Sequence, residues 1–290
     1  MLVHVLDTLE SAGIGRSVVV TGHGADAVEA AVEGRAGCIR QEPQRGTADA
    51  VRVALDAVPT DAGEVIVTMG DVPLQPAELV TELLTARRTA GAAMALVAAT
   101  LEPPTGYGRI RRGTDRAVTA IVEEADADEA IRAISEVNVG TYAFDVAWLR
   151  TAIGRIGASA SGEYYLTDLV ALAVADGRGV EAVLAPDPDD ALGINDRVAL
   201  AAAEERMRRR INETHMRNGV TIVEPATTRI DAAVEIGQDA RIEPGTTLQG
   251  ATIIAQDAVI GPNAHVRDSR IGPRSHVWAS VVEDLSLIHI

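Results

Sequence analysis

The sequence is poor in several residue types, and each shortage excludes something. Its 290 residues include no lysine, one cysteine and only 2% aromatic residues. The single cysteine, Cys38, excludes an internal disulfide and a multi-cysteine zinc site, which suits a reducing cytoplasm. With so few aromatic residues, the core is expected to consist of alanine, valine, leucine and isoleucine.

Positive charge is also scarce. The chain has 42 acidic and 26 basic residues, and its formal net charge is −16. A field of this sign repels nucleic acid and anionic membranes, so we expect no nucleic-acid partner. No apolar run is long enough to span a membrane, and the opening residues lack the features of a secretory signal. These observations predict a cytoplasmic protein.

Short apolar runs alternate with helical patterns from residue 1 to about 195. The expected strands lie within 16–22, 37–41, 64–71, 93–101, 117–124, 136–144 and 180–186. Apolar residues at three- and four-residue spacing predict helices over 25–34, 47–58 and 76–91. This alternation predicts an α/β fold whose mixed, mostly parallel sheet carries helices on both faces. The range 106–140 is richer in strand, so we expect an antiparallel insertion there.

A long helix is expected over 196–218, ending at Gly219. Its arginines could bind phosphate, but their acidic neighbours favour a solvated, charge-paired helix face. These arginines are Arg206, Arg208, Arg209 and Arg210.

The period of the sequence changes after Gly219. Aliphatic residues then recur every six positions, at Ile230, Ile236, Ile242, Leu248, Ile254, Ile260 and Val266. A small residue lies two positions before most of them, at Ala240, Thr246, Thr252, Ala258 and Ala264. The register then slips by one residue before Ile271 and Val277 resume it. A hexapeptide period predicts a parallel β-helix with aliphatic residues inside and small residues at its corners.

A candidate metal ligand follows the apolar run in "VIVTMGDVPLQP", residues 65–76. The run stops at Gly70 and Asp71, which places the Asp71 carboxylate at the carboxyl end of a predicted strand, where open α/β sheets bind ligands. A carboxylate there can bind Mg²⁺ together with substrate phosphates. The alternative is an aspartate that only starts the turn before Pro73.

Two more segments place polar or glycine residues at a helix start. In "IRQEPQRGTADAV", the Gln41 amide and the backbone at Gly46 and Thr47 could contact a base edge or a phosphate, although Thr47 could simply cap the helix. In "TGHGADA", the glycine spacing could suit a dinucleotide, and an ordinary tight turn is the stronger interpretation.

The ordered set of motifs resembles one family. "Q-x-x-x-x-G-T", "GDVPL", "TGYGRI", "IVE-x-x-DA", "E-V-N-x-G-x-Y", "GEYYLTD" and "G-I-N-D-R" occur in this order before the hexapeptide repeat. This arrangement resembles the bifunctional bacterial N-acetylglucosamine-1-phosphate uridyltransferase and glucosamine-1-phosphate acetyltransferase (GlmU family), over residues 1 to about 284. The resemblance implies a Rossmann-like nucleotidyltransferase domain over 1–195, a linker helix over 196–219 and the start of a left-handed β-helix over 220–284. Residues 285–290 would be a tail foreign to the family.

The resemblance also implies the chemistry. The parent protein would convert UTP and N-acetylglucosamine 1-phosphate to UDP-N-acetylglucosamine and pyrophosphate, and would acetylate glucosamine 1-phosphate with acetyl-CoA as a homotrimer. Asp71 and Asn195 would hold Mg²⁺ and act in catalysis. Gln41, Gly46, Thr47, Met69 and Gly70 would contact the uridine nucleotide. Gly108, Glu123 and Asn138 would hold the sugar, with Glu163 and Thr167 nearby.

The chain also departs from the family pattern. The family's first strand and its glycine-rich basic phosphate loop have no counterpart, and the repeat stops after about three coils, before the expected acetyl-CoA site. His265 and His276 do not match that site's catalytic histidine and are expected to be surface residues. We therefore expect a fragment with little activity. A nucleotidyltransferase for another base or sugar, or a non-catalytic sensing or assembly subunit, are the alternatives.

Overall fold

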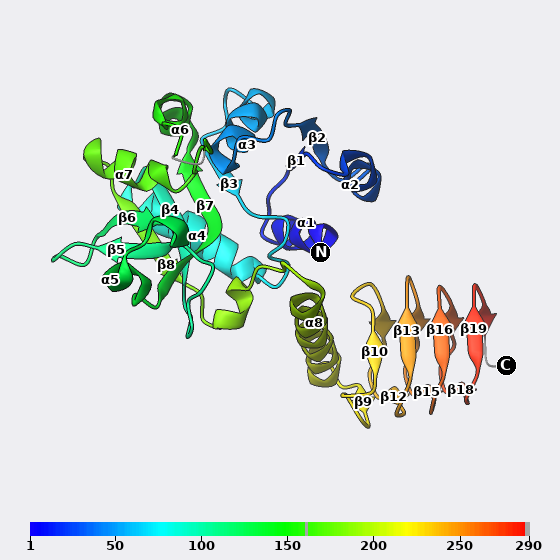
Figure 1. The fold of residues 1–290 in the computed structure, drawn as a ribbon. Helices are drawn as coiled ribbons and strands as arrows, with labels where there is room; N and C mark the ends of the chain where they lie inside the picture. Colours follow the sequence, from blue (N-terminus) through cyan, green and yellow to red (C-terminus); the bar gives the residue numbers. More distant parts are fainter. Residues whose placement is uncertain (160–161, 288–290) are drawn as a thin grey trace. The chain divides into compact units, whose positions relative to one another are not determined.

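The computed structural model describes residues 1–159 and 162–287. The chain forms two compact units, Met1–Ile194 and Asn195–Ile290. Figure 1 labels elements of both units where there is room. No helix among the described residues is long and apolar enough to cross a membrane.

The first unit has the expected alternation of strands and helices. Its helices are α1 Leu2–Ser11, α2 Ala25–Ala31, α3 Thr47–Ala54, α4 Ala77–Ala90, α5 Glu129–Arg132, α6 Val146–Ala152 and α7 Asp168–Ala175. Its strands are β1 Val18–Thr21, β2 Gly37–Arg40, β3 Glu64–Val67, β4 Met94–Thr100, β5 Arg109–Arg112, β6 Val118–Val122, β7 Glu136–Asp145 and β8 Val180–Leu184. Each of the seven strands expected from the sequence is present, and β5 is an additional one.

The main sheet is mixed, as expected, but most of its pairings are antiparallel. Strand β7 pairs antiparallel with β3, β4 and β5, and β5 pairs antiparallel with β6. Only β4 and β8 pair in parallel within this sheet, and the parallel β1–β2 pair forms a sheet of its own. The prediction of a mostly parallel sheet was therefore wrong in its pairing. The reason is β7, which runs against β3 and β4 and separates them. The β5–β6 hairpin confirms the predicted antiparallel insertion.

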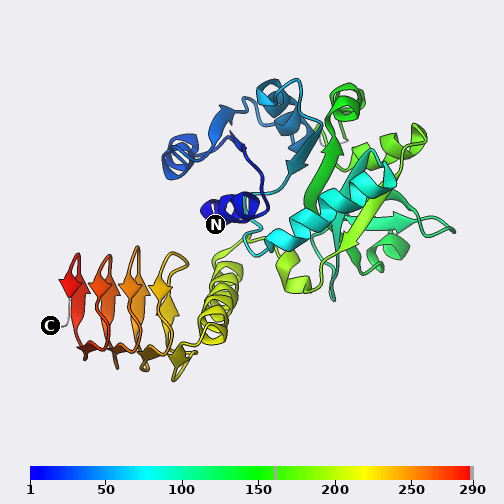
Figure 2. The same cartoon turned by 180° about the vertical axis from the view of Figure 1, so that it is seen from behind.

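Helices cover both faces of this sheet (Figure 2). Alternate residues of a strand point to opposite faces, and β4 is buried on both. Met94, Leu96 and Ala98 pack in the cluster that includes α3, α6 and α7. Ala95 and Val97 pack in the cluster that includes α4. The result is a three-layer arrangement in which polar groups can gather at the strand ends.

Strand β3 ends earlier than the sequence suggested. Its last residue is Val67, whereas the apolar run predicted a strand to Gly70. The Thr68 hydroxyl instead shares a 2.8 Å hydrogen bond with that of Thr141 on β7, and Thr141 donates to Gln75 Oε1 at 2.9 Å. After Val67, these side-chain hydrogen bonds hold the chain in place of the backbone hydrogen bonds between paired strands. Asp71 thus lies in the turn after the strand rather than at its last position.

The second unit begins with the predicted long helix, α8 Arg197–Arg217. Twelve short strands follow in the part of this unit that the structure describes, and each has two or three residues. They are β9 Thr221–Ile222, β10 Arg229–Ile230, β11 Glu235–Ile236, β12 Arg241–Ile242, β13 Thr247–Gln249, β14 Ile253–Ile254, β15 Val259–Ile260, β16 His265–Arg267, β17 Arg270–Ile271, β18 His276–Val277, β19 Val281–Glu283 and β20 Ser286–Leu287.

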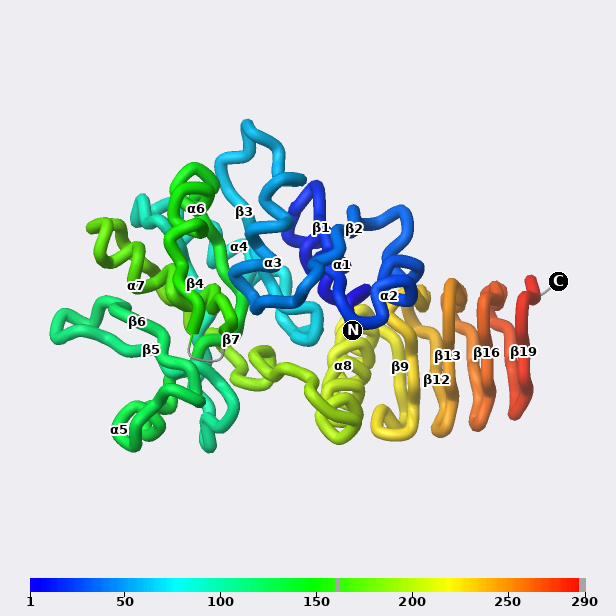
Figure 3. Tube along the Cα trace, turned by 45° about the horizontal axis from the view of Figure 1, so that its top comes forward, coloured from blue at the N-terminus to red at the C-terminus, as the bar shows by residue number. Residues whose placement is uncertain are grey.

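These strands form three parallel sheets of four strands each, which the chain visits in turn. Arg229 pairs with Thr247 and Arg241 with Val259, so one circuit takes three hexapeptides. Figure 3 shows the successive circuits as a row of similar turns. The slip in the repeat shortens one circuit, because Ile253 pairs with Arg270. The arrangement is consistent with the predicted β-helix.

Burial follows the hexapeptide pattern. Ile242, Ile254 and Ile260 are buried, as are the small residues of the repeat at Ala240 and Ala258. Side chains this small let the chain turn at a corner without displacing the aliphatic interior. The same core extends onto α8, where Ile211 and Met216 pack against it. The helix therefore covers apolar residues of the first circuit, which an open end would expose.

The expected foreign tail continues the fold as far as it is described. Ser286–Leu287 form β20, which pairs with β17, and the Leu285 carbonyl accepts a hydrogen bond from the Arg270 N–H. These residues therefore continue the strand pairing of the repeat, and their being foreign to the family stays a prediction. Residues 288–290 lie outside the described residues.

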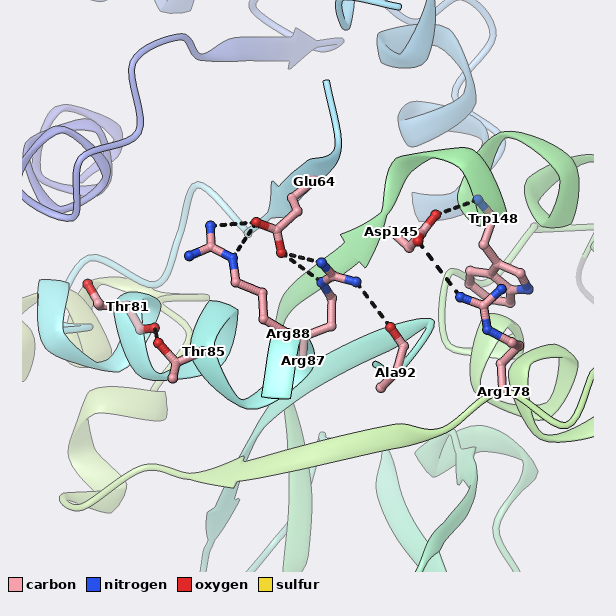
Figure 4. Close-up of polar contacts among 9 residues, drawn as sticks. All are labelled: Glu64, Thr81, Thr85, Arg87, Arg88, Ala92, Asp145, Trp148 and Arg178. Carbon is pink, nitrogen blue, oxygen red and sulfur yellow. Dashed lines mark hydrogen bonds and ion pairs between the residues drawn. The ribbon is translucent and has the colours of Figure 1, made fainter. Parts of the chain in front are cut away.

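A charged cluster fastens β3 to the end of α4 (Figure 4). Glu64, the first residue of β3, accepts from Arg87 Nε at 3.0 Å and from Arg88 Nε at 2.6 Å. Arg87 also donates to the Ala92 carbonyl at 3.1 Å. Burial opposes ionisation of Glu64, but the hydrogen bonds from both arginines outweigh it and hold the pKa of Glu64 below its ordinary value. The cluster therefore keeps its charges at neutral pH.

We expect Arg87→Ala to lower the free energy of unfolding of the first unit by about 3 kcal/mol, because it leaves the partly buried Glu64 Oε1 and the Ala92 carbonyl without their donor. Arg88→Ala is the matched control, since the Arg88 side chain is 60% exposed against 10% for Arg87. It should cost at most about 1 kcal/mol.

Urea denaturation in a Trp278→Phe background measures this difference, because Trp148 in the first unit is then the sole tryptophan. If both variants lost the same free energy of unfolding, the buried Arg87 would stabilise the unit no more than the exposed Arg88, which would contradict the prediction.

Candidate functional site

Four segments of the first unit bring the predicted sugar residues together. The Asn138 N–H donates to the Gly108 carbonyl at 2.8 Å. Glu123 follows β6, and its Oε1 accepts from the Thr167 hydroxyl at 2.8 Å. A Cβ atom on Gly108 would lie 3.3 Å from Glu123 Oε2 and 2.8 Å from Ile121, so the glycine lets the carboxylate approach the backbone. The cluster presents carboxylate, amide and hydroxyl groups side by side.

A β-bulge in β7 sets the position of Asn138. Leu96 pairs with Tyr142 and Ala98 pairs with Asn138, so three residues of β7 lie opposite one residue of β4. At the centre of the bulge, Gly140 has a φ of 85°, and a Cβ atom there would lie 2.9 Å from Met69 Cγ. A side chain at this position would be strained and would clash, which explains the glycine in the motif.

The Asn138 amide is held at both ends. Its Nδ2 donates to the Tyr142 hydroxyl at 2.7 Å, and its Oδ1 accepts from the Gly140 N–H at 3.2 Å. Burial raises the pKa of the Tyr142 phenol well above its ordinary value, so the phenol stays neutral. Because the amide is pre-oriented, it loses little freedom when it meets a ligand.

Glu123 has an unusual environment for a carboxylate. Burial raises the pKa of Glu123 above its ordinary value, while the hydrogen bond from Thr167 partly offsets this effect. The negative charges of Asp126 and Asp168 raise it further. Ionising Glu123 therefore costs the folded protein free energy. Perturbed carboxylates of this kind occur often at ligand sites.

Three of the predicted nucleotide residues, Gln41, Gly46 and Thr47, lie in the segment that joins β2 to the start of α3. This segment is called the second arm. Gln41 is buried, and its Nε2 donates to the Gly46 carbonyl at 3.2 Å and to Asp49 Oδ2 at 2.9 Å. Gly46 precedes α3, and a Cβ atom there would lie 2.7 Å from the Tyr164 carbonyl oxygen. The glycine is thus needed for close packing of two chain segments.

Thr47 does not cap α3. Gly46 is the N-cap residue, and no side chain caps the helix. The Thr47 hydroxyl accepts a hydrogen bond from the Leu166 N–H at 3.0 Å instead. Together with the bond from the Ala48 N–H to the Tyr164 carbonyl, it joins this arm to the segment that carries Thr167.

The Asp71 carboxylate lies in the turn after β3. Within the described part of the chain it has no hydrogen bond or ion pair, whereas its carbonyl accepts from the Ile194 N–H at 3.0 Å. A half-exposed carboxylate without a protein cation fits a hard metal ion such as Mg²⁺. Asn195 is the first residue of the second unit, so its pairing with Asp71 stays a prediction.

The remaining predicted residues have simpler surroundings. Met69 lies beside Gly140, and Gly70 is exposed. Glu163 is exposed, and its backbone bonds to Ser159, while its side chain forms no hydrogen bond with the cluster around Asn138 in the described ranges. No group of three or more histidine, cysteine, aspartate or glutamate residues in those ranges could hold a metal ion. A metal bound here would rely on few protein ligands.

Sequence reasoning missed two residues that orient site groups. Tyr142 holds the Asn138 amide, and Asp49 holds the Gln41 amide. Tyr142 ends the motif "E-V-N-x-G-x-Y" and Asp49 lies in "IRQEPQRGTADAV", but neither was given a role. The alternation along β7 could have shown Tyr142 on the same face as Asn138, but nothing local predicts that Asp49 is buried.

The pKa of Glu123 leads to a prediction for stability. Since its folded pKa lies above the unfolded value, the protein should lose stability as pH rises through the folded pKa. Glu123→Gln removes the ionisation but keeps an oxygen acceptor for Thr167. We expect this variant to be more stable than the unaltered chain at neutral pH, and the difference to vanish below the ordinary glutamate pKa.

Glu124→Gln is the matched control with the opposite sign. A hydrogen bond from Arg109 holds the pKa of Glu124 below its ordinary value. Its substitution should therefore lower stability at neutral pH and lose this effect as pH falls through that pKa. Melting temperatures of both variants across pH check the pair, and the same pH dependence for both would contradict the assignment.

The chain is similar to a family model and to several known proteins. The family model described as "Nucleotidyl transferase" matches residues 1–190. The protein named Bifunctional protein GlmU of an Exiguobacterium species is 44% identical over 285 residues, which cover 98% of this chain and 63% of that protein. The protein of the same name from Geobacillus thermodenitrificans is also 44% identical, with 98% of this chain and 62% of that protein covered.

A third relative extends the match to the whole chain. Bifunctional protein GlmU of Enterococcus faecalis is 40% identical over 290 residues, which cover 100% of this chain and 63% of that protein. The chain thus spans less than two thirds of the length of these relatives. Because the family model covers most of its length, the chain belongs to the nucleotidyl transferase family of enzymes.

Proposed function

We propose that the first unit carries the site for uridylyl transfer from UTP to N-acetylglucosamine 1-phosphate, which yields UDP-N-acetylglucosamine and pyrophosphate. Family membership supports a nucleotidyl transfer, and the relatives named Bifunctional protein GlmU favour this pair of substrates. The observation that carries the proposal is the cluster of Gly108, Glu123, Asn138 and Thr167. It gathers four residues that the resemblance assigned to, or near, the sugar.

The chemistry of the cluster suits an N-acetylated sugar. The Glu123 carboxylate can accept from sugar hydroxyls, and the Asn138 amide can both donate and accept. The absence of a side chain at Gly108 lets the Glu123 carboxylate lie close to the backbone. Buried polar groups that a ligand must satisfy discriminate strongly against analogues that lack the matching group.

The protein's role in the reaction would be to position two anionic substrates. An oxygen of the sugar phosphate attacks the α-phosphorus of UTP, and pyrophosphate leaves. Such catalysis depends on alignment and on charge neutralisation. Asp71 and Asn195 would hold Mg²⁺, which supplies the positive charge when bound. Gln41, Gly46, Thr47, Met69 and Gly70 would orient the nucleotide, and the cluster around Asn138 would orient the sugar phosphate.

We extend the proposal to the rest of the chain. Residues 1–195 would be the uridyltransferase domain and 196–219 the linker helix. Residues 220–284 would begin a closed, left-handed β-helix belonging to an acetyl-CoA-dependent acetyltransferase of glucosamine 1-phosphate. The full-length protein would be a cytoplasmic homotrimer in the synthesis of cell-wall precursors. The family's basic phosphate loop has no counterpart in residues 1–290. We therefore expect this chain to bind UDP-N-acetylglucosamine but to catalyse uridylyl transfer only slowly.

Asn138→Ala tests the sugar site. It removes the amide held by Tyr142, and we expect the affinity for UDP-N-acetylglucosamine to fall by about ten-fold or more. Calorimetric titration measures the loss, and Asn218→Ala in the second unit is the matched control with an unchanged affinity expected. Equal affinity of the Asn138 variant and the unaltered chain would reject the sugar site.

Asp71→Asn tests the metal ligand. We expect Mg²⁺ to tighten binding of UDP-N-acetylglucosamine to the unaltered chain, and this enhancement to fall about ten-fold in the variant. Asp61→Asn, at an exposed aspartate, should keep the full enhancement. Titrations with and without Mg²⁺ provide the comparison. An equal enhancement in the Asp71 variant would show that this carboxylate is no ligand.

A further inference from the structure

The Gln41 side chain is held in one orientation by its surroundings. An amide carries two N–H donors on one side and an oxygen acceptor on the other. Both partners of Gln41 Nε2, the Gly46 carbonyl and Asp49 Oδ2, can only accept from it. The reversed amide would face two acceptors with its oxygen, which is unfavourable in a buried place. These two contacts therefore fix the orientation of the Gln41 amide, with its nitrogen toward Gly46 and Asp49.

Asp49 is the stronger of the two constraints. Its side chain is only 6% exposed, and its contact with Nε2 is the shorter one. The hydrogen bond from Gln41 lowers the pKa of Asp49, and Arg52, which binds Oδ1, lowers it further against the opposing effect of burial. The carboxylate thus stays ionised at neutral pH and offers no proton of its own to Gln41.

In this orientation, the Gln41 amide has only its oxygen left to offer a ligand. Both N–H groups face the protein, and among the described residues no donor bonds its Oε1. A ligand that meets this side chain therefore meets an acceptor. Uracil presents an N–H donor at N3, whereas cytosine presents a lone pair at N3, so a fixed acceptor at that position separates the two bases.

We propose that Asp49 is a positioning residue that locks the Gln41 amide with its oxygen toward the nucleotide, so that the site selects a base with an N–H donor at N3. This inference rests on the proposed uridine site. It adds a residue to that site and a physical cause for its choice of base. Asp49 acts through Gln41 and need not touch the substrate.

Asp49→Ala and Asp49→Asn test the proposal, with UDP and CDP in the presence of Mg²⁺ as the probes. The unaltered chain should bind UDP about ten-fold or more tightly than CDP, because the mismatched base leaves a polar pair unsatisfied. In the alanine variant, the Gly46 carbonyl alone favours the original orientation of the Gln41 amide. In the asparagine variant, Arg52 can hold the single amide oxygen, so the amide nitrogen faces Gln41 and favours its reversal. The reversed Gln41 amide offers a donor to cytosine. The ratio of the CDP and UDP dissociation constants should fall several-fold in both variants.

Asp49→Asn keeps the side-chain volume, so it gives a readout if the alanine variant folds poorly. Asp56→Ala is the matched control on an exposed aspartate of the same segment, and it should keep the ratio of the unaltered chain. General damage to the site would weaken UDP and CDP alike and leave the ratio unchanged, and that result would overturn the role of Asp49. An unaltered chain that prefers CDP would also overturn it.

The experiment also separates this inference from the proposed function. If the unaltered chain prefers UDP and the Asp49 variants keep that preference, the uridine site stands and the positioning role fails. If the unaltered chain binds neither UDP nor CDP, the uridine site itself fails, and the role of Asp49 fails with it.

Discussion

The bulge at Gly140 in β7 is the constraint on which the first unit's candidate site depends. Strand β7 pairs on both of its edges, with β4 on one side and with β3 and β5 on the other. A regular strand in this position would carry only an alternating pattern of buried side chains. The bulge inserts extra residues, and Asn138 then lies where its backbone meets Gly108 and its amide meets Tyr142. Without this distortion, the cluster around Asn138 would lose its central residue.

The rest of the site follows from the cost of burying polar groups. Gln41 and Thr167 are buried and Glu123 largely so, and each has a specific partner. Thr47 likewise accepts from the Leu166 backbone, and this bond ties the arm that carries Gln41 to the segment that carries Thr167. Each contact satisfies a group that would otherwise destabilise the fold, and each also fixes the orientation of a side chain. Stability and pre-organisation of the site thus have the same physical origin.

Much of this could be predicted from the sequence, for reasons that differ between the units. The hexapeptide repeat of the second unit was readable because every circuit buries the same kinds of residue, so the signal recurs. In the first unit, the strands were readable from their apolar runs. Their pairing was not, because the antiparallel course of β7 is set by long-range contacts. The early end of β3 depends in the same way on Thr141, a residue far away in the chain.

The candidate site was predictable only in part. Resemblance to a family pointed to Glu123 and Asn138, and the structure brings them together with Gly108. It could not show that the Thr47 hydroxyl accepts from Leu166, or that Asp49 is buried against Gln41. Such contacts join segments that share no local pattern. The exposed position of Glu163 could not be predicted from its motif either.

We propose that the first unit binds a uridine nucleotide and an N-acetylated sugar together, and a crystal structure of this chain with UDP-N-acetylglucosamine and Mg²⁺ is the decisive experiment. We expect the sugar between Glu123 and Asn138, the uracil N3 facing Gln41 Oε1, and the metal on Asp71. A ligand bound away from these residues, with the cluster around Asn138 unchanged, would contradict the proposal.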